Sequence, residues 1–252
     1  MRADHQMAAI FMDEYGFLIE EYIEGPEFSF ETIVLDDAFH ISVQEKARID
    51  RLDRTTLESM SISPPISVDR DVILAGADFV ARCLAATGVT HGAFHVEAKY
   101  WTARRRWEIV EINPRMGGSL INASVKALTG SSVLELWVDA LLTGADGREA
   151  LRSRLTHVSQ LESLRLGTAS KATVFLSKYG LKGRTIDAIE FAANDRRPDI
   201  LKLRVEPGTT LEDSDRAICL MDALWQVPYA ELPREVTNLD RYAAEHFHVE
   251  YR

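Results

Sequence analysis

The chain has few cysteines, no long apolar run and no excess of positive charge. Its two cysteines, Cys83 and Cys219, are far apart and lack metal-ligand spacing, which fits a reducing compartment. No apolar segment reaches the length of a membrane span, and the N-terminus lacks the basic-then-apolar layout of a signal peptide. We therefore expect a cytoplasmic location and no membrane partner. The 39 Asp and Glu residues outnumber the 29 Lys and Arg residues, and the net charge of −10 argues against general nucleic-acid binding.

Two extended segments, His95–Trp101 and Trp107–Asn113, are separated by the polar run 102–106. This pattern predicts a β-hairpin. We place Trp101 opposite Trp107 and step back along both strands by twos. The remaining predicted pairs are Lys99 with Ile109, Glu97 with Glu111, and His95 with Asn113.

This register brings two carboxylates, Glu97 and Glu111, directly opposite each other, where they repel. On a half-buried strand a cation between them, or protonation of one, relieves the repulsion. The amide oxygen of Asn113 completes a set of hard oxygen ligands typical of Mg²⁺ or Mn²⁺. Arg115 adds a planar cation suited to a phosphoryl or carboxylate group. Three alternatives stay open. Glu-Ile-Asn-Pro can be an ordinary strand end that opens a turn, and either Glu could lie on a solvated face. His95 either donates a hydrogen bond to the site or packs within the strand.

A second motif lies upstream, where residues 17–34 read FLIEEYIEGPEFSFETIV. The extended stretch 20–23 can hold a flat adenine ring by its backbone amide and carbonyl groups. Gly25-Pro26 then turns the chain so that the carboxylate of Glu27 can accept both ribose hydroxyls. Taken alone, the pattern favours a plain hairpin with Gly-Pro at its turn. The predicted adenine-binding residues are Glu20, Glu21, Tyr22 and Ile23.

Residues 87–142 contain THGAFHVEAKY, WEIVEINPRMGGS and KALTG, and in them the chain closely resembles the ATP-grasp carboxylate–amine ligases. Within that superfamily it is most similar to the L-amino-acid (dipeptide) ligases, including the carnosine-synthase-like branch. The resemblance implies that Arg115 contacts the transferring phosphate and that Lys46 approaches the phosphates, although Lys46 alone reads as a solvated surface lysine. It also implies that the upstream motif binds adenine and ribose. The implied metal ligands are Glu97, Glu111 and Asn113.

For the complete site, the resemblance implies ATP- and magnesium-dependent formation of an amide or peptide bond through an acyl phosphate. A substrate carboxylate attacks the γ-phosphorus, Arg115 stabilises the developing charge, and an amine then displaces the phosphate. We expect both small-molecule substrates to be amino acids. The backbone amides of Gly117 and Gly118 would steady the acyl group, and Ser119 or Asn122 would contact the second substrate.

The predicted fold is α+β, with an ATP-grasp C-terminal lobe made of an antiparallel sheet and flanking helices, followed by a small β-rich C-terminal domain. The predicted boundaries are 1–147 for the lobe with its nucleotide and metal site and 148–252 for the small domain. The polar stretches 48–65 and 144–155 are interpreted as irregular chain and as a linker. Amphipathic helices are predicted over 69–86, 120–128 and 133–142.

Only 16 residues precede the upstream motif, whereas the first lobe of an ATP-grasp enzyme supplies phosphate-binding lysines and a Gly-rich lid. We therefore expect a truncated or split ligase whose N-terminal lobe comes from a separate chain. A transferring phosphoryl group needs neutralisation on several sides, so half of the nucleotide pocket should bind ATP weakly. The alternative is a non-catalytic ATP-binding or assembly subunit derived from such a ligase.

Overall fold

A computed structural model describes residues 19–52, 55–192, 195–212 and 217–252. Within these ranges the strands form a large sheet, in the order β5-β4-β1-β2-β3-β6-β9-β8, and a small sheet of β10 and β7. Every pair of neighbouring strands is antiparallel, as predicted. The strands are β1 (Glu27–Leu35), β2 (Asp37–Leu52), β3 (Thr55–Ser63), β4 (His91–Trp101), β5 (Arg106–Asn113), β6 (Lys171–Tyr179), β7 (Ile186–Phe191), β8 (Ile200–Leu203), β9 (Cys219–Pro228) and β10 (Phe247–Tyr251).

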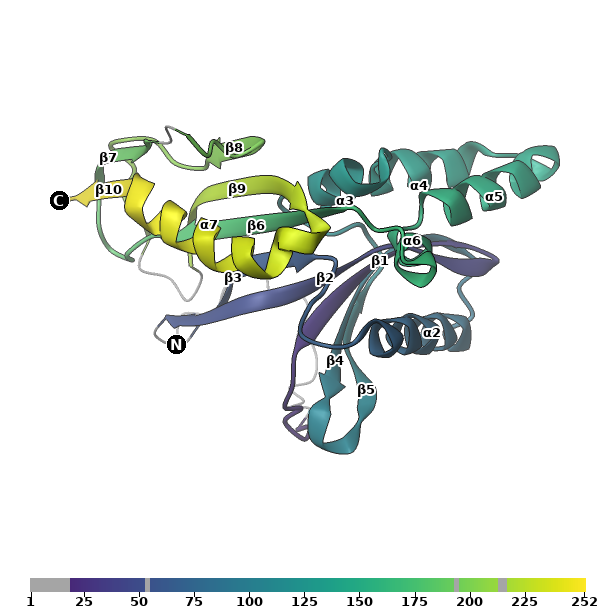
Figure 1. The fold of residues 1–252 in the computed structure, drawn as a ribbon. Coiled ribbons are helices and arrows are strands. Elements are labelled where there is room, and N and C mark those ends of the chain that lie inside the picture. Colours follow the sequence, from purple (N-terminus) through teal and green to yellow (C-terminus); the bar gives the residue numbers. More distant parts are fainter. Residues whose placement is uncertain (1–18, 53–54, 193–194, 213–216) are drawn as a thin grey trace, which may run out of the picture.

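The first half of the large sheet consists of β5, β4, β1 and β2, and the second half of β3, β6, β9 and β8. Helices flank the first half on both faces (Figure 1). α2 and α6 pack on one face around Phe28 and Phe30, whereas α3, α4 and α5 cover part of the opposite face around Ile33 and Leu35. α7 packs on the second half of the sheet. No helix in the described ranges is long and apolar enough to cross a membrane. The helices are α2 (Arg70–Ala86), α3 (Ile121–Thr129), α4 (Val133–Leu142), α5 (Arg148–Val158), α6 (Gln160–Leu166) and α7 (Leu232–His246).

The three predicted helices are confirmed within one residue at each end. In α2 the buried residues Ile73, Ala77, Val80 and Leu84 recur every three or four positions, so one face of the helix meets the core. α4 begins at a capping box, in which the side chain of Ser132 accepts a hydrogen bond from the backbone of the third helical residue.

The predicted irregular stretch over 48–65 is wrong, because β2 continues to Leu52 and β3 spans Thr55–Ser63. In the sequence β3 resembles an exposed polar segment, because several of its buried residues are serines. Ser63, for example, is 1% exposed and donates a hydrogen bond to the backbone oxygen of Val43 at 2.7 Å. The predicted linker over 144–155 is also wrong, since α5 lies there and buries Leu151 and Leu155.

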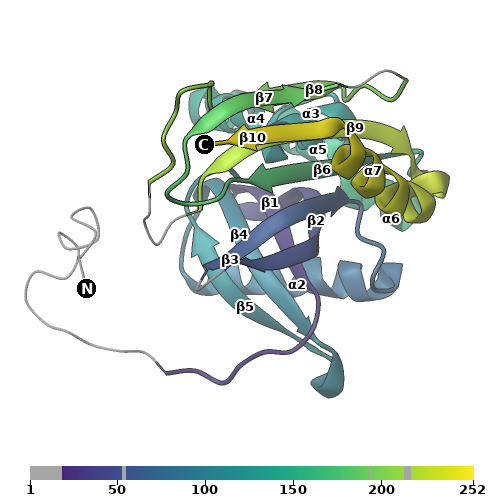
Figure 2. The same ribbon diagram turned by 90° about the vertical axis from the view of Figure 1, so that its left-hand side faces the viewer.

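The large sheet continues without a break into the C-terminal half, because β6 pairs with β3 between Met60↔Leu176 and Ser63↔Thr173. α5 and α6 lie beyond residue 147 but pack on the core of the first half. Figure 2 shows the small sheet of β7 and β10 at the same end of the molecule as β8. The domain boundary between residues 147 and 148 stays a prediction.

Candidate functional site

One face of β1 changes from apolar to charged along the strand. Side chains alternate between the two faces of a strand, so Leu35, Ile33 and Glu31 share the face that carries α3, α4 and α5. At Leu35 and Ile33 this face is buried under those helices. Farther along it becomes polar, so the core ends there and a cleft can begin. The polar pairs across β1 and β4 are Glu31 with His95, Ser29 with Glu97, and Glu27 with Lys99.

The β4–β5 register confirms the two pairs that define the predicted site, Glu97 opposite Glu111 and His95 opposite Asn113. The two pairs nearer the turn are wrong. Trp101 pairs with Arg106, and Lys99 pairs with Glu108. A β-bulge between Glu97 and Ala98 shifts the register by one residue and restores the predicted pairing at the site.

A hydrogen-bonded chain of charged groups crosses three strands at this end of the sheet. The fully buried carboxylate of Glu31 contacts Nδ1 of His95, and Nε2 of His95 lies 3.1 Å from Oε1 of Glu97. The other oxygen of Glu97 lies 2.8 Å from Nζ of Lys46 on β2. The interpretation of Lys46 as a solvated surface lysine is wrong, because its side chain is only 12% exposed, whereas its predicted role toward the phosphates stays a prediction.

These hydrogen bonds determine the charge states of His95 and Glu97. Burial works against a charged imidazole, but hydrogen bonds to Glu31 and Glu97 raise the pKa of His95 to about 9. Burial also disfavours an ionised Glu97, yet hydrogen bonds from His95 and Lys46 lower its pKa to about 2. At neutral pH the site therefore presents a carboxylate, an imidazolium and an ammonium in direct contact.

Lys46 also lies 2.5 Å from the carboxylate of Glu27, which in turn lies 3.4 Å from Nζ of Lys99. Burial opposes the charge on Lys46, but hydrogen bonds to Glu27 and Glu97 raise its pKa above the ordinary value. The expected role of Glu27 toward ribose stays a prediction. Its carboxylate lies between the ammonium groups of Lys46 and Lys99.

The predicted hinge over residues 20–23 lies in an extended segment without strand pairing, and β1 begins only at Glu27. A strand before the Gly-Pro turn is thus absent from residues 19–26, while residues 17 and 18 lie outside the described ranges. The hinge lines a cavity of about 450 Å³ together with Lys99, whose Nζ lies 5.2 Å from the ring centroid of Tyr22. The hinge residues in this cavity are Glu20, Glu21, Tyr22 and Ile23.

The loop after β5 approaches the buried carboxylate of Glu31. The backbone N–H of Gly117 donates to Oε2 of Glu31 at 2.9 Å. A Cβ at Gly117 would lie 2.6 Å from Oε1 of Glu31 and 3.0 Å from Nδ1 of His95, so only glycine fits. Gly118 has open space around its Cα, where a Cβ would meet no atom within 4 Å. Arg115 is exposed, and its guanidinium donates to the backbone oxygen of Met116 at 3.1 Å.

The three predicted metal ligands present hard oxygen atoms, but too few to fill the coordination sphere of a metal ion by themselves. Nδ2 of Asn113 donates to Oε1 of Glu111 at 2.6 Å, and Glu97 is ionised. In the described ranges no group of three or more His, Cys, Asp or Glu side chains could hold a metal ion by itself. Two carboxylates and an amide oxygen fit Mg²⁺ when phosphate oxygens or water supply the other positions. The metal assignment therefore depends on a bound phosphate group.

A cleft of about 490 Å³ is lined by residues from both halves of the large sheet. It is lined from the first half by Glu97, Arg115 and Gly118, and from the second half by residues that no predicted motif contains. Asn122 does not line it; its Oδ1 accepts a hydrogen bond from the backbone N–H of Val133 at 2.8 Å and so supports the start of α4. The polar residues from the second half are Ser177, Tyr179, Arg204, Cys219 and Asp222.

Asp222 is the most buried of these cleft residues, at 1% exposure. Burial raises its pKa, but hydrogen bonds from Ser177, Ser119 and Arg204 outweigh burial and lower the pKa below the usual value. Ser119 has a positive φ of 50°, an uncommon backbone conformation for a residue with a side chain. The hydrogen bonds to Asp222 join residues that are far apart in the sequence, so no local motif predicts them.

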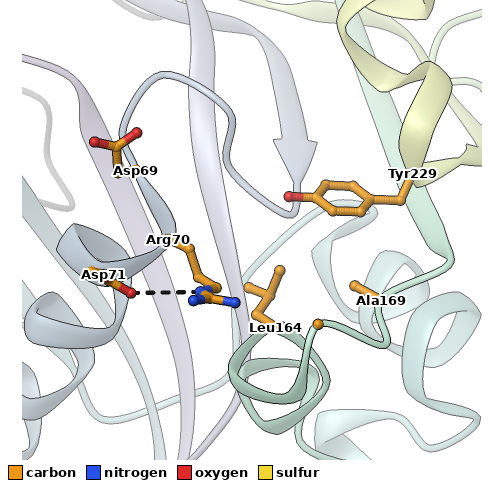
Figure 3. Close-up of a pocket in the computed structure, with 7 residues that line it drawn as sticks. Asp69, Arg70, Asp71, Leu164, Ala169 and Tyr229 are labelled. Carbon is orange, nitrogen blue, oxygen red and sulfur yellow. Dashed lines mark ion pairs between the residues drawn. The ribbon is translucent and has the colours of Figure 1, made fainter.

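A cavity of about 470 Å³ lies elsewhere, at the beginning of α2 (Figure 3). Figure 3 shows Tyr229 facing Arg70 and Leu164 across it, with Arg70 paired to Asp71. None of the predicted site residues lines this cavity. It is therefore separate from the site described above.

Comparisons with known proteins agree with the geometry. Residues 1–123 match the family model of the ATP-grasp domain. Carnosine synthase 1 of Gallus gallus is 30% identical over 176 residues, which are 67% of this chain and 18% of that protein. An L-amino acid ligase from Bacillus licheniformis matches with a TM-score of 0.70 at 19% identity, over 92% of this chain and 53% of that chain.

A third match is the biotin carboxylase domain of a 2-oxoglutarate carboxylase from Hydrogenobacter thermophilus, in complex with magnesium ADP. Its TM-score is 0.59 at 12% identity, over 92% of this chain and 48% of that chain. At such low identities the two structural matches show a shared fold alone. The chain spans 18% of the curated relative and about half of each of the two solved chains.

Proposed function

Because this chain belongs to the ATP-grasp superfamily, we propose that it carries the metal- and phosphate-binding half of an ATP- and magnesium-dependent carboxylate–amine ligase. In the proposed reaction, a substrate carboxylate takes the γ-phosphoryl group of ATP to give an acyl phosphate and ADP. An amine then attacks the acyl carbon, which forms the C–N bond and releases phosphate. Amide or peptide formation is the result.

One observation supports this proposal above the others. Glu97, Arg115 and Gly118, which lie at different places along the chain, line one cleft of about 490 Å³, and Lys46 contacts Glu97 beside it. A carboxylate with a lowered pKa can bind a divalent cation, and the two cationic side chains can neutralise a phosphate group. The cleft thus places one proposed metal ligand, Glu97, next to two cationic side chains, although Glu111 and Asn113 do not line it.

The proposed metal ligands are Glu97, Glu111 and Asn113, whose oxygen donors fit Mg²⁺. When bound, the metal neutralises phosphate charge and orients the phosphoryl group. One carboxylate oxygen of Glu97 lies 2.8 Å from Nζ of Lys46, and the other faces His95. A metal ion would use the remaining lone pairs of these oxygens. His95 and Lys46 thereby keep Glu97 ionised and oriented.

The remaining residues would act on the reacting groups. Arg115 would stabilise the negative charge that develops on the transferring phosphoryl group. The backbone amide of Gly118, a residue with open space around it in the cleft, would steady the acyl oxygen, whereas that of Gly117 already donates to Glu31. Gly117 would therefore hold the loop in place rather than contact the substrate.

The hinge would bind adenine beside Lys99, in the cavity of about 450 Å³. We propose that a further lobe, which the described residues do not contain, completes the other face of the nucleotide pocket. The names of two matched proteins, carnosine synthase and L-amino acid ligase, support amino acids as both the carboxylate and the amine.

Turnover tests the proposal directly. The full chain is incubated with Mg-ATP and a mixture of amino acids, ADP release is measured, and new amides are sought by mass spectrometry. Glu111→Gln should abolish metal-dependent turnover and leave the melting temperature unchanged, because Glu111 is exposed. Glu250→Gln, an exposed change on β10, is the matched control. Full turnover in Glu111→Gln would refute the metal assignment. For a chain that forms no product by itself, metal-dependent ATP binding that Glu111→Gln leaves unchanged would refute it.

A further inference from the structure

A second cluster of polar groups lies in the cleft, on the side of the C-terminal half. At its centre is Asp222 on β9, which is almost fully buried. A carboxylate can accept about four hydrogen bonds, and the neighbours of Asp222 already supply that number. Asp222 is therefore saturated and is not itself a ligand-binding group. Its donors are Ser119 at 2.8 Å, Ser177 at 2.7 Å, Cys219 at 3.3 Å, and Arg204.

Asp222 fixes the guanidinium of Arg204 on one edge. Nε of Arg204 donates to Oδ2 of Asp222 at 2.7 Å, and Nη2 donates to Asp222 and also to Oγ of Ser119 at 3.3 Å. Nη1 has no hydrogen-bond partner among the residues that the structure describes, and the Arg204 side chain is 38% exposed at the wall of the cleft. The two N–H groups of Nη1 therefore remain free among the described contacts and can donate to a carboxylate.

Ser119 links Arg204 to the reacting end of the cleft. It contacts both Arg204 and Asp222 and directly follows Gly118, the residue proposed to steady the acyl group. An anion bound by Arg204 would therefore lie in the same cleft as the acyl group. In an α- or β-amino acid, only one or two carbon atoms join the amine to the carboxylate, so both groups can enter one cleft.

Resting on the proposed ligase function, we infer that Arg204 binds the free carboxylate of the amine substrate. The amine substrate is then an amino acid rather than a simple amine. Arg204 supplies the specificity, because an amine without a carboxylate leaves its open edge unused. Ser119 and Asp222 are positioning residues that hold the guanidinium against the loop.

Ligand binding tests this inference without any need for turnover. The probes are alanine, histidine and phenylalanine, each compared with its amide, which keeps the amine and the size but removes the negative charge. Saturation-transfer NMR on the full chain gives the dissociation constants. The wild-type chain should bind each acid at least about tenfold more tightly than its amide, as expected for a charged hydrogen-bonded contact. Arg204→Gln should remove that preference.

Two further variants keep the test decisive. Arg70→Gln removes one positive charge from the separate cavity at α2 and should keep the wild-type preference. Arg204→Lys retains the charge beside Asp222 but loses the planar fork, so it should show a reduced preference even if Arg204→Gln fails to fold. A wild-type chain without a preference for the acid, or an unchanged preference in the Arg204 variants, would overturn the inference.

Mg-ATP binding is measured on the same samples by calorimetry. A chain that shows the Arg204-dependent preference but no Mg-ATP binding keeps the carboxylate subsite and loses the proposed ligase function. A chain that binds Mg-ATP without the preference keeps the proposed function and loses the subsite. The failures of the two proposals are thus distinguishable.

Discussion

Replacing Gly117 by alanine would force a methyl group into occupied space. The new Cβ would lie 2.6 Å from Oε1 of Glu31, 2.7 Å from Cγ2 of Ile121 and 3.0 Å from Nδ1 of His95. Glu31 cannot move aside freely, because it is fully buried and bonded to both His95 and the backbone of Gly117. Overpacking of this kind costs about 1–3 kcal/mol. A shift of the loop would also weaken the 2.9 Å hydrogen bond from Gly117 to Glu31.

The expected result is a melting temperature lowered by roughly 2–12 °C, since 1 kcal/mol shifts the midpoint by about 2–4 °C in a chain of this size. Gly118→Ala is the matched control, because a Cβ there meets no atom within 4 Å. Its melting temperature should stay close to that of the wild type. Thermal unfolding followed by circular dichroism measures both variants. Equal melting temperatures for the two variants would refute the close packing of this loop against Glu31.

Three further predictions concern the charged site and the hinge. The raised pKa of His95, about 9, means that its protonated form stabilises the fold fully below the ordinary value of 6.5 and that this contribution is lost as the pH rises through 9. His95→Gln should flatten that fall in unfolding free energy in urea titrations, and an unchanged slope would contradict the pairing. Lys46→Met should raise the pKa of Glu97 above its value of about 2, read from carboxylate NMR shifts; an unmoved midpoint would argue against the ion pair. Gly25→Ala, whose Cβ would overlap the backbone oxygen of Tyr100, should lower the unfolding free energy by about 1 kcal/mol or more, and a wild-type value would contradict this contact.

The site register was predictable from the sequence, although two errors cancelled in reaching it. Placing Trp101 opposite Trp107 assumed a turn one residue too long, since Trp101 pairs with Arg106. The bulge beside Glu97 adds one residue on β5 and removes the offset. Strand alternation cannot reveal a bulge, because its extra residue looks like any other strand position. The carboxylate pair was right because the overlong turn and the missing bulge offset each other.

The polar strand β3 and the helix α5 were missed for a common physical reason. Binary patterning equates polarity with exposure, but Ser59, Ser61 and Ser63 are buried and hydrogen-bonded. In α5 only Leu151 and Leu155 are buried, so most of its residues are polar and resemble a linker. Tertiary contacts decide both segments, and a local pattern does not contain them.

The contribution of the C-terminal half to the cleft was also beyond local reasoning. Ser119 and Asp222 are 103 residues apart in the sequence, and Arg204 reaches both of them only because β8 and β9 join the same large sheet. A compact motif marked the proposed metal- and phosphate-binding residues. The groups that face them could not be predicted in the same way, because they lie on strands without a comparable motif.

Calorimetric titration of Mg-ATP into the full chain is the decisive measurement for the proposed metal site. We expect binding that requires Mg²⁺, that is lost in Glu111→Gln, and that is kept in Glu250→Gln. Equal binding of ATP in the presence of a metal chelator, or unchanged metal-dependent binding in Glu111→Gln, would contradict the assignment of Glu97, Glu111 and Asn113 to a nucleotide-bound metal.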